Sequence, residues 1–237
     1  MTEPVSSTVS RRDFILKSGV FLGAAAWLGP ARALAAEKTE METAEVTPTE
    51  DLMQEHGVLR RLLLLYDDLE SRLKQGREVP LEVLREATGV IRRFVEDYHE
   101  KDEEEYLFTR FEKAGKLVEL VKVLYQQHQA GRKLTAALQD LLSPDRWGKA
   151  PERQQAAVYL HAFSRMYRPH AAREDTVLYP GFRTVISPKE FLDLGEKFEA
   201  KEEKLFGKDG FEKVVAQVAD LEKRLGIYQL SQFTPVV

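Results

Sequence analysis

Apolar residues recur along the middle of this chain at the alternating three- and four-residue spacing of an amphipathic helix. These stripes predict four long helices, over residues 51–75, 80–115, 117–142 and about 160–177. The first two connections are short, which favours antiparallel neighbours. Each helix would bury one apolar side against the others. We therefore predict an all-α fold, an antiparallel up-down four-helix bundle.

Two further amphipathic segments follow these four. Ser187 precedes a proline, a combination typical of a helix cap and a first-turn residue, and predicts a helix over 187–206. Another helix is expected over about 210–226. The charged runs 201–204 and 222–224 read as solvated faces, and neither segment contains a histidine. We expect both C-terminal helices to pack beside the bundle without supplying ligands.

Polar residues occupy six stripe positions where an apolar residue would be expected: His56, His99, Glu103, His128, His170 and Glu174. His99 and His170 are each followed four residues later by a glutamate. Because four residues are about one helical turn, each such pair projects from one face of its helix. Burying bare carboxylates is costly unless something cationic meets them. Six polar residues directed into one core therefore indicate a pair of metal ions.

The positions of these residues along their helices support a common layer. His56 lies about 19 residues before the first turn and His99 about 19 residues after it, so at ~1.5 Å per residue both lie ~30 Å from that end of the bundle. Glu103 lies about 10 residues before the second turn and His128 about 12 after it. Residues far apart in the sequence are thus expected at a similar height.

Composition narrows the chemistry. Apolar residues make up 43% of the chain, enough to fill the core of one domain. With 35 Lys+Arg against 39 Asp+Glu the net charge is −4, so there is no basic excess to indicate nucleic-acid binding. The chain contains no cysteine, which excludes disulfides, thiolate zinc sites, cysteine-ligated iron–sulfur clusters and thiol catalysis. Any metal must be held by nitrogen and oxygen.

The N-terminal segment has the features of an export signal. Residues 10–17, Ser-Arg-Arg-Asp-Phe-Ile-Leu-Lys, precede an apolar run over 20–28 that is too short to span a bilayer comfortably. The paired arginines resemble a twin-arginine (Tat) signal. Small residues at 33–35 place cleavage after about Ala35. We therefore expect a Tat signal peptide over 1–35, and an uncleaved membrane anchor is the alternative.

This assignment carries expectations for the mature protein. It would be periplasmic or otherwise exported, would use the Tat translocase during export, and would have no stable membrane span once the signal is cleaved. Residues 36–50 are rich in Thr and Glu with little to bury, and are expected to form a linker.

Four short segments, in this order, closely resemble the hemerythrin-like (HHE cation-binding) family: 52–56 (Leu-Met-Gln-Glu-His), 99–104 (His-Glu-Lys-Asp-Glu-Glu), 127–132 (Gln-His-Gln-Ala-Gly-Arg) and 170–180 (His-Ala-Ala-Arg-Glu-Asp-Thr-Val-Leu-Tyr-Pro). One segment alone would be weak, but four in the right order and spacing are specific. The resemblance assigns 51–182 to the bundle and leaves 183–237 as a C-terminal helical extension. It implies a hemerythrin-like four-helix bundle that holds two non-haem irons bridged by an oxo or hydroxo group.

Carried over residue by residue, the resemblance implies that His56 and His99 bind one iron. His128 and His170 would bind the other. Glu103 and Glu174 would be the bridging carboxylates. Imidazole and carboxylate are ligand types suited to non-haem iron.

The chain departs from the oxygen carriers of the family at one notable position. Those proteins have a second histidine four residues after the one in the third helix, and here that position is Arg132. Four nitrogens in place of five leave an open or water-filled coordination position. This departure favours sensing, redox chemistry or iron handling over reversible oxygen carriage. A proline frequent after Leu-Phe in the second helix is replaced by Thr109, a minor difference.

Other residues near the motifs remain alternatives. Asp102 and Asp175 each lie one residue from a predicted bridging carboxylate and could replace it. Glu96 and Glu100 flank the second-helix histidine and could orient it, although surface placement is the commoner arrangement. His161 lies half a rotation from the fourth-helix motif and is expected to stay outside the site.

The resemblance implies an exported non-haem di-iron protein that binds or reacts with a small ligand such as O2, NO or peroxide, or handles iron. A peroxidase- or oxidase-like di-iron oxidoreductase that uses the open coordination position is the alternative, and the sequence favours a metal-binding protein over an enzyme. A store or chaperone for iron or zinc is a further possibility. A ferritin-like carboxylate centre is disfavoured, because only Glu96-x-x-His99 matches its Glu-x-x-His motif.

Overall fold

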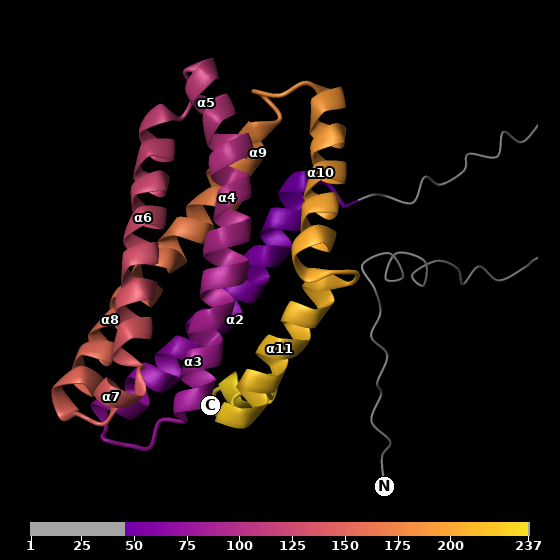
Figure 1. Ribbon diagram of the computed structural model, residues 1–237. Coiled ribbons are helices and arrows are strands. Elements are labelled where there is room, and N and C mark those ends of the chain that lie inside the picture. Colours follow the sequence, from indigo (N-terminus) through magenta and orange to yellow (C-terminus); the bar gives the residue numbers. More distant parts are fainter. Residues whose placement is uncertain (1–45, 237) are drawn as a thin grey trace, which may run out of the picture. The chain divides into compact units, whose positions relative to one another are not determined.

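The computed structural model describes residues 46–236. These residues form helices and no strand, which confirms the all-α prediction (Figure 1). The predicted signal peptide over 1–35, its cleavage after Ala35 and most of the 36–50 linker lie outside the described residues.

The first long helix, α2 (Pro48–Lys74), begins three residues before the predicted start. Thr47 caps it: its hydroxyl accepts a hydrogen bond from the backbone N–H of Glu50, and the Glu50 carboxylate accepts one from the backbone N–H of Thr47. The apolar stripe begins later than this capping box, so the stripe alone placed the start too late. A turn through Gly76, at φ 67°, follows the helix.

The second rod is helical throughout but not uniformly wound. It consists of α3 (Leu81–Val90), the π-helix η1 (Ile91–His99), α4 (Glu100–Asp102), the π-helix η2 (Glu103–Phe108) and α5 (Thr109–Ala114). π-Helical turns are rare and occur frequently at functional sites. The rod ends at Gly115, whose φ of 63° only glycine adopts readily.

The third and fourth rods complete the bundle. Helix α6 (Val118–Leu141) starts after Leu117, whose φ of 51° excludes it from the predicted helical stripe. The short helix α7 (Pro144–Trp147) connects to α8 (Ala150–Arg173). The π-helix η3 (Glu174–Leu178) and α9 (Tyr179–Phe182) extend α8.

The four rods pack side by side. Helix α2 lies against α8, α8 lies against α6, and η1 contacts both α2 and α6. In Figure 1, α5 and the start of α6 lie near one end of the rods, and α7 lies near the other. The described residues therefore form a helical bundle of the kind that the hemerythrin-like resemblance implies.

The apolar core is divided into two clusters with polar residues between them. The larger cluster fills the end near α7 and the smaller cluster fills the end near α5. Along α2, His56 lies between Leu52 of the smaller cluster and Val58 of the larger cluster. Along α6, His128 lies in the same way between Leu124 and Leu138. The histidine layer is thus closed on both sides by apolar packing.

The two C-terminal helices, α10 (Pro188–Phe206) and α11 (Gly210–Leu225), were expected from their stripes and are present. Both pack on the side of α2, and α11 also packs on α3. Helix α10 supplies apolar residues to the smaller cluster and α11 supplies them to the larger one. A short 3-10 helix, η4 (Leu230–Phe233), follows.

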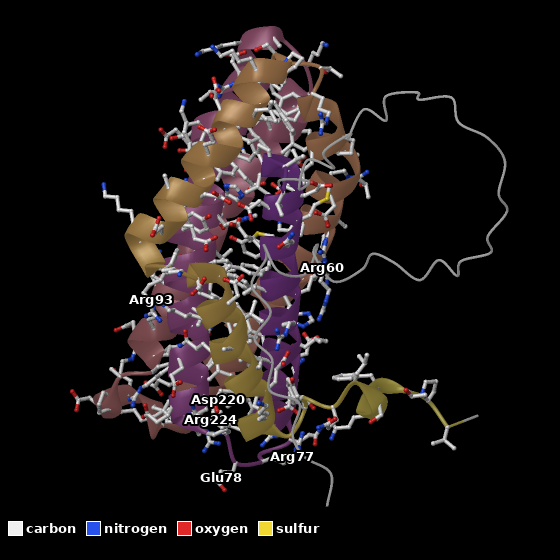
Figure 2. The ribbon with its side chains drawn as sticks, turned by 90° about the vertical axis from the view of Figure 1, so that its right-hand side faces the viewer. Arg60, Arg77, Glu78, Arg93, Asp220 and Arg224 are labelled. Atoms are coloured by element: carbon white, nitrogen blue, oxygen red, sulfur yellow. The ribbon has the colours of Figure 1, made fainter. Side chains whose placement is uncertain are left out.

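The prediction that the charged runs of these helices are solvated was wrong at two positions. Lys201 pairs with the buried carboxylate of Asp102, and the buried Glu222 pairs with Arg61 at 2.6 Å. These salt bridges fasten the extension to the bundle. At the surface, Arg224 lies beside Asp220 near the end of α11 (Figure 2). No helix within residues 46–236 is both long enough and apolar enough to cross a membrane.

Candidate metal centre

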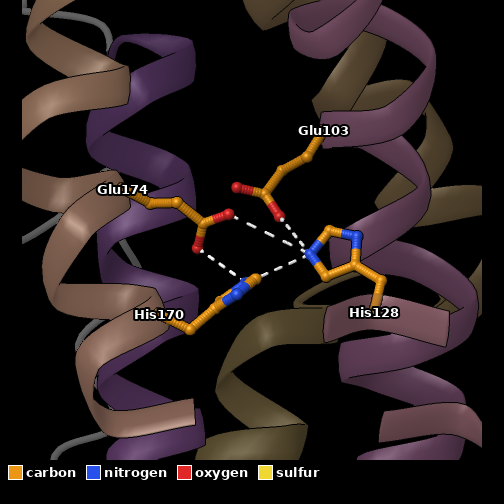
Figure 3. Close-up of side chains that lie close together, drawn as sticks. All are labelled: Glu103, His128, His170 and Glu174. Carbon is orange, nitrogen blue, oxygen red and sulfur yellow. Dashed lines mark hydrogen bonds and ion pairs between the residues drawn. The ribbon is translucent and has the colours of Figure 1, made fainter. Parts of the chain in front are cut away.

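The six polar residues predicted from the stripes lie together in the layer between the two apolar clusters. Each is at most 3% exposed. Figure 3 shows four of them converging from different helices: Glu103, His128, His170 and Glu174. His56, His99 and Glu103 form a second group that shares Glu103 with the first. Nitrogen and oxygen ligands for more than one ion are therefore present in one buried place.

The four histidines form two pairs. The ring centroids of His56 and His99 are 4.7 Å apart, and those of His128 and His170 are 4.9 Å apart. We refer to these pairs as the α2 half and the α6 half of the centre, after the helix that carries the first histidine of each.

Each carboxylate lies between the two halves. Glu103 Oε2 is 3.6 Å from His99 Nε2 and 3.4 Å from His128 Nε2. Glu174 Oε2 is 3.3 Å from His56 Nε2 and 3.1 Å from His170 Nε2. Each glutamate thus reaches one histidine of each half, a position between the halves from which a carboxylate can bridge two ions.

All four imidazoles are held by an outward contact at Nδ1. In the α2 half, His56 Nδ1 lies 2.7 Å from Asp175 Oδ1, and His99 Nδ1 lies 2.7 Å from Glu55 Oε2. An Nδ1–H that donates to such an oxygen leaves the Nε2 lone pair directed into the layer. These contacts therefore select the tautomer that a metal ligand needs.

The α6 half repeats this arrangement. His128 Nδ1 lies 3.2 Å from Glu104 Oε1, and His170 Nδ1 lies 2.8 Å from Gln127 Oε1. The Nε2 atoms of His128 and His170 then face each other at 3.1 Å. Two lone pairs at that distance repel unless a proton or a cation lies against them.

The buried charges shift one another's pKa values. Burial by itself lowers the pKa of His56, but hydrogen bonds to Asp175 and Glu174 raise it to about 9. Burial raises the pKa of Glu174, whereas His170 and His56 hold it well below its usual range. The imidazolium and carboxylate forms thus stabilise each other. A metal ion that binds here must displace protons from the imidazoles.

The donor atoms fit a metal pair by spacing and by chemistry. Ligand atoms that bind one ion at ~2.1 Å lie ~3.0–3.4 Å apart when they are neighbours in octahedral or tetrahedral geometry. The carboxylate-to-imidazole distances in the layer, 3.1 to 3.6 Å, are close to that range. With the imidazoles in the neutral form that binds metal, both oxygens of Glu174 and Oε2 of Glu103 are buried without a hydrogen-bond donor among the described residues. A bound cation would satisfy these oxygens.

The alternative residues lie outside the layer. Asp175 contacts the outer nitrogen of His56 and Asp102 faces Lys201, so neither replaces a predicted bridging glutamate. The side chain of His161 is 54% exposed and lies 3.1 Å from Glu70.

The expectation of a surface position for Glu96 and Glu100 was wrong, because both are buried. Glu96 accepts a hydrogen bond from Thr135 and pairs with Arg92 at 2.6 Å. Basic and hydroxyl side chains thus replace the solvent that these carboxylates lose.

Arg132, which stands where the oxygen carriers have a further histidine, points at carboxylates. Its guanidinium lies 2.7 Å from Glu100 and 2.7 Å from Glu104. Glu100 also accepts a hydrogen bond from Tyr167 at 2.5 Å. Tyr167 in turn packs edge-on against His170, with ring centroids 5.2 Å apart. Arg132 therefore anchors a polar network behind the α6 half.

Sequence reasoning missed one hydroxyl that faces the layer. Tyr179 Oη donates a hydrogen bond to Glu103 Oε1 at 2.7 Å and lies 3.4 Å from His56 Nε2. Its position five residues after Glu174 was a usable signal. The outward contacts of the histidines had a signal as well, since Glu55 and Gln127 immediately precede histidines in the sequence.

Comparison with known proteins decides the family. The family model described as the hemerythrin HHE cation binding domain matches residues 47–183. This chain belongs to the hemerythrin HHE family. Membership implies metal binding, with iron as the expected metal, and the buried clusters of histidine and glutamate are compatible with it.

Relatives of this HHE protein occur in mycobacteria. An uncharacterized protein of Mycobacterium tuberculosis is 47% identical over 199 residues, which cover 84% of this chain and 78% of the relative. An uncharacterized protein of Mycobacterium bovis matches with the same identity and the same coverage. No solved structure matches the chain significantly.

Proposed function

We propose that the centre holds two non-haem iron ions and binds or reacts with a small ligand such as O2, NO or peroxide. His56 and His99 would hold one ion and His128 and His170 the other. Glu103 and Glu174 would bridge them. The observation that carries this proposal is the reach of each glutamate to one histidine of each half. We also propose that the bundle has the antiparallel up-down topology of hemerythrin-like proteins.

Iron ions would supply redox chemistry and an electron-accepting position for a small ligand. The protein would supply orientation and a dry environment. Outward contacts at Nδ1 fix the four imidazoles, so their Nε2 atoms are positioned before a metal arrives. The apolar clusters on both sides of the layer exclude bulk water. Only a small molecule would fit into such a site.

Sensing, redox chemistry or iron handling suits this centre better than reversible oxygen carriage. Arg132 is directed at Glu100 and Glu104 and leaves the α6 half with two imidazoles. A coordination position is then free for an exogenous ligand. The same feature favours a second candidate, a peroxidase- or oxidase-like di-iron oxidoreductase.

We propose further that the protein is exported through the Tat translocase and functions in the periplasm or beyond. The support is the sequence over 10–17 and the small residues before Ala35. Transport of a folded protein would allow the metal to be inserted before export. Replacing both arginines of the signal, Arg11 and Arg12, with lysine should retain the chain in the cytoplasm, and unchanged export would contradict the assignment.

Metal analysis of glutamate variants tests the di-iron proposal. The full-length chain purified aerobically should contain about two irons. Glu103→Ala and Glu174→Ala should each lose most of the metal from both halves, because each removes a ligand shared by both ions. Elemental analysis of the purified variants measures this loss.

His161→Ala is the matched control, because His161 is exposed and outside the layer, and it should retain the full complement. Full iron retention by both glutamate variants, or zinc in place of iron in the parent, would refute the proposal. Titration of the iron-loaded chain with peroxide separates the two candidates: sustained turnover identifies an oxidoreductase, and a stoichiometric spectral change identifies a binding protein.

A further inference from the structure

The two halves of the centre each contain an aromatic ring at the same position of a repeated motif. Phe108 lies five residues after Glu103, and Tyr179 lies five residues after Glu174. Phe108 stacks on His128 with centroids 5.4 Å apart and an interplanar angle of 20°. Tyr179 stacks on His56 with centroids 5.5 Å apart and an angle of 21°. Phe108 and Tyr179 thus occupy equivalent positions, each stacked on the first histidine of its half, and they differ by one hydroxyl.

That hydroxyl lies among the donor atoms of the α2 half. Tyr179 is 1% exposed, and its Oη lies 2.7 Å from Glu103 Oε1 and 3.4 Å from His56 Nε2. Phe108 offers no oxygen at the corresponding place in the α6 half. A buried tyrosine hydroxyl needs only one acceptor, so packing alone does not require it to face a histidine nitrogen.

The distance from Tyr179 Oη to His56 Nε2 is that of neighbouring ligand atoms. Atoms bound to one ion at ~2.1 Å lie ~3.0–3.4 Å apart, and these two atoms are 3.4 Å apart. The shorter distance of 2.7 Å to Glu103 Oε1 is that of the hydrogen bond that the hydroxyl donates without a metal. Ferric iron binds oxygen anions strongly, and a phenolate is such an anion. The α2 half supplies only two imidazoles to its ion, His56 and His99, so a position on that ion is free for an oxygen ligand from the protein.

We propose that Tyr179 is a metal ligand of the α2 half, binding ferric iron through its phenolate oxygen, and that the α6 half keeps its free position for the exogenous ligand. This inference rests on the proposed di-iron function. On binding, the Oη–H bond breaks as the oxygen–iron bond forms, and the proton leaves to solvent without any change in oxidation state. The two ions would then differ in ligand set although their histidines and glutamates repeat.

Resonance Raman spectroscopy of the ferric-loaded full-length chain tests this assignment. Excitation into the visible absorption should enhance phenolate ring vibrations, and these should shift when the protein is labelled with ring-deuterated tyrosine. Tyr179→Phe should lose the phenolate bands while it retains bound iron, because it removes one oxygen from a buried ring and leaves the histidines in place. Tyr167→Phe is the matched control, because Tyr167 is also buried against a histidine but donates to Glu100, and it should keep the bands.

The outcomes separate this inference from the proposed function. If the parent chain binds no iron by elemental analysis, the di-iron proposal fails and this assignment fails with it. If the parent binds iron and shows no phenolate bands, Tyr179 is a hydrogen-bond donor to Glu103 and the assignment alone is overturned. Phenolate bands that persist in iron-loaded Tyr179→Phe overturn it equally. If that variant does not fold, the presence or absence of tyrosine-isotope shifts in the parent and in Tyr167→Phe still decides whether a tyrosine binds the iron.

Discussion

In the α2 half of the centre, the residue before the first histidine, Glu55, contacts the second histidine; in the α6 half, Gln127 does the same. The residue after each of Glu174 and Glu103 contacts the first histidine of a half: Asp175 contacts His56, and Glu104 contacts His128. An arginine one turn beyond each first histidine then binds that carboxylate. The two halves therefore repeat one contact pattern around the metal layer.

The two halves differ in the groups that make no contact with the Nδ1 atoms of the histidines. Tyr179 of the α2 half corresponds to Phe108 of the α6 half. The α6 half has an additional buried network in which Glu100 joins Arg132 to Tyr167. The repeated contacts therefore orient the imidazoles, whereas the unmatched groups make the surroundings of the two halves chemically different.

The two corresponding arginines provide the largest expected contrast in stability. Arg132→Ala would leave the buried Glu100 without its cation and should lower the free energy of unfolding by about 3 kcal/mol. Arg60→Ala should lower it by less than about 1 kcal/mol. The Arg60 side chain is 48% exposed at the edge of α2 (Figure 2), against 14% for Arg132. Urea denaturation of both metal-free variants measures the two free energies of unfolding. Equal decreases would show that the two arginines stabilise the protein equally, contrary to this prediction.

A smaller contrast is expected from the outward contacts of the second histidines. Glu55→Gln replaces a carboxylate at His99 Nδ1 with a neutral amide, which should weaken metal binding in the α2 half by about 10- to 100-fold. Gln127→Glu makes the opposite change at His170 and should strengthen binding in the α6 half. Competition with a coloured chelator would measure both affinities. If metal affinity fell in both variants or rose in both, the group at Nδ1 would not control the strength of metal binding by its histidine.

The smallest single effects are expected at two glycines on the helices that name the halves. A Cβ at Gly131 would lie 2.0 Å from Tyr167 Oη, so Gly131→Ala should displace the tyrosine from Glu100. We expect a net destabilisation of about 1–2 kcal/mol, after the gain in helix propensity. A Cβ at Gly57 of α2 meets nothing within 4 Å, and Gly57→Ala should stabilise the chain by about 0.5–1 kcal/mol. Thermal unfolding distinguishes these opposite signs, and stabilisation by both variants would show that Tyr167 moves freely.

Much of the fold was predictable because the spacing of apolar residues within one segment is enough to indicate an amphipathic helix. The apolar period gave the four rods and both C-terminal helices, but the fourth rod begins at Ala150, ten residues before the first residue of its predicted stripe. Errors arose where a local feature overrode the period. The capping box at Thr47 started α2 early, and the left-handed conformation of Leu117 delayed α6. The period also gave no sign of the π-helical turns that contain Glu103 and Glu174.

The candidate site was less completely predictable. Its six central residues could be named from spacing, since a histidine and a glutamate four residues apart share a helix face. The residues around them could not. Glu96 and Glu100 looked like surface carboxylates, because their partners Thr135, Arg132 and Tyr167 come from other helices. No pattern within one helix reveals a partner on another.

Which residues face the core follows from the amino-acid order, because 3.6 residues per turn fix the direction of every side chain relative to its own helix. The entry of histidines and glutamates from four helices into one layer follows in the same way. Contacts between helices do not follow from it: which oxygen contacts each imidazole, the turn of Arg132 to Glu100, and the contact of the Tyr179 hydroxyl with Glu103. Such contacts join separate helices, and they depend on how the helices are rotated and offset when their apolar faces pack.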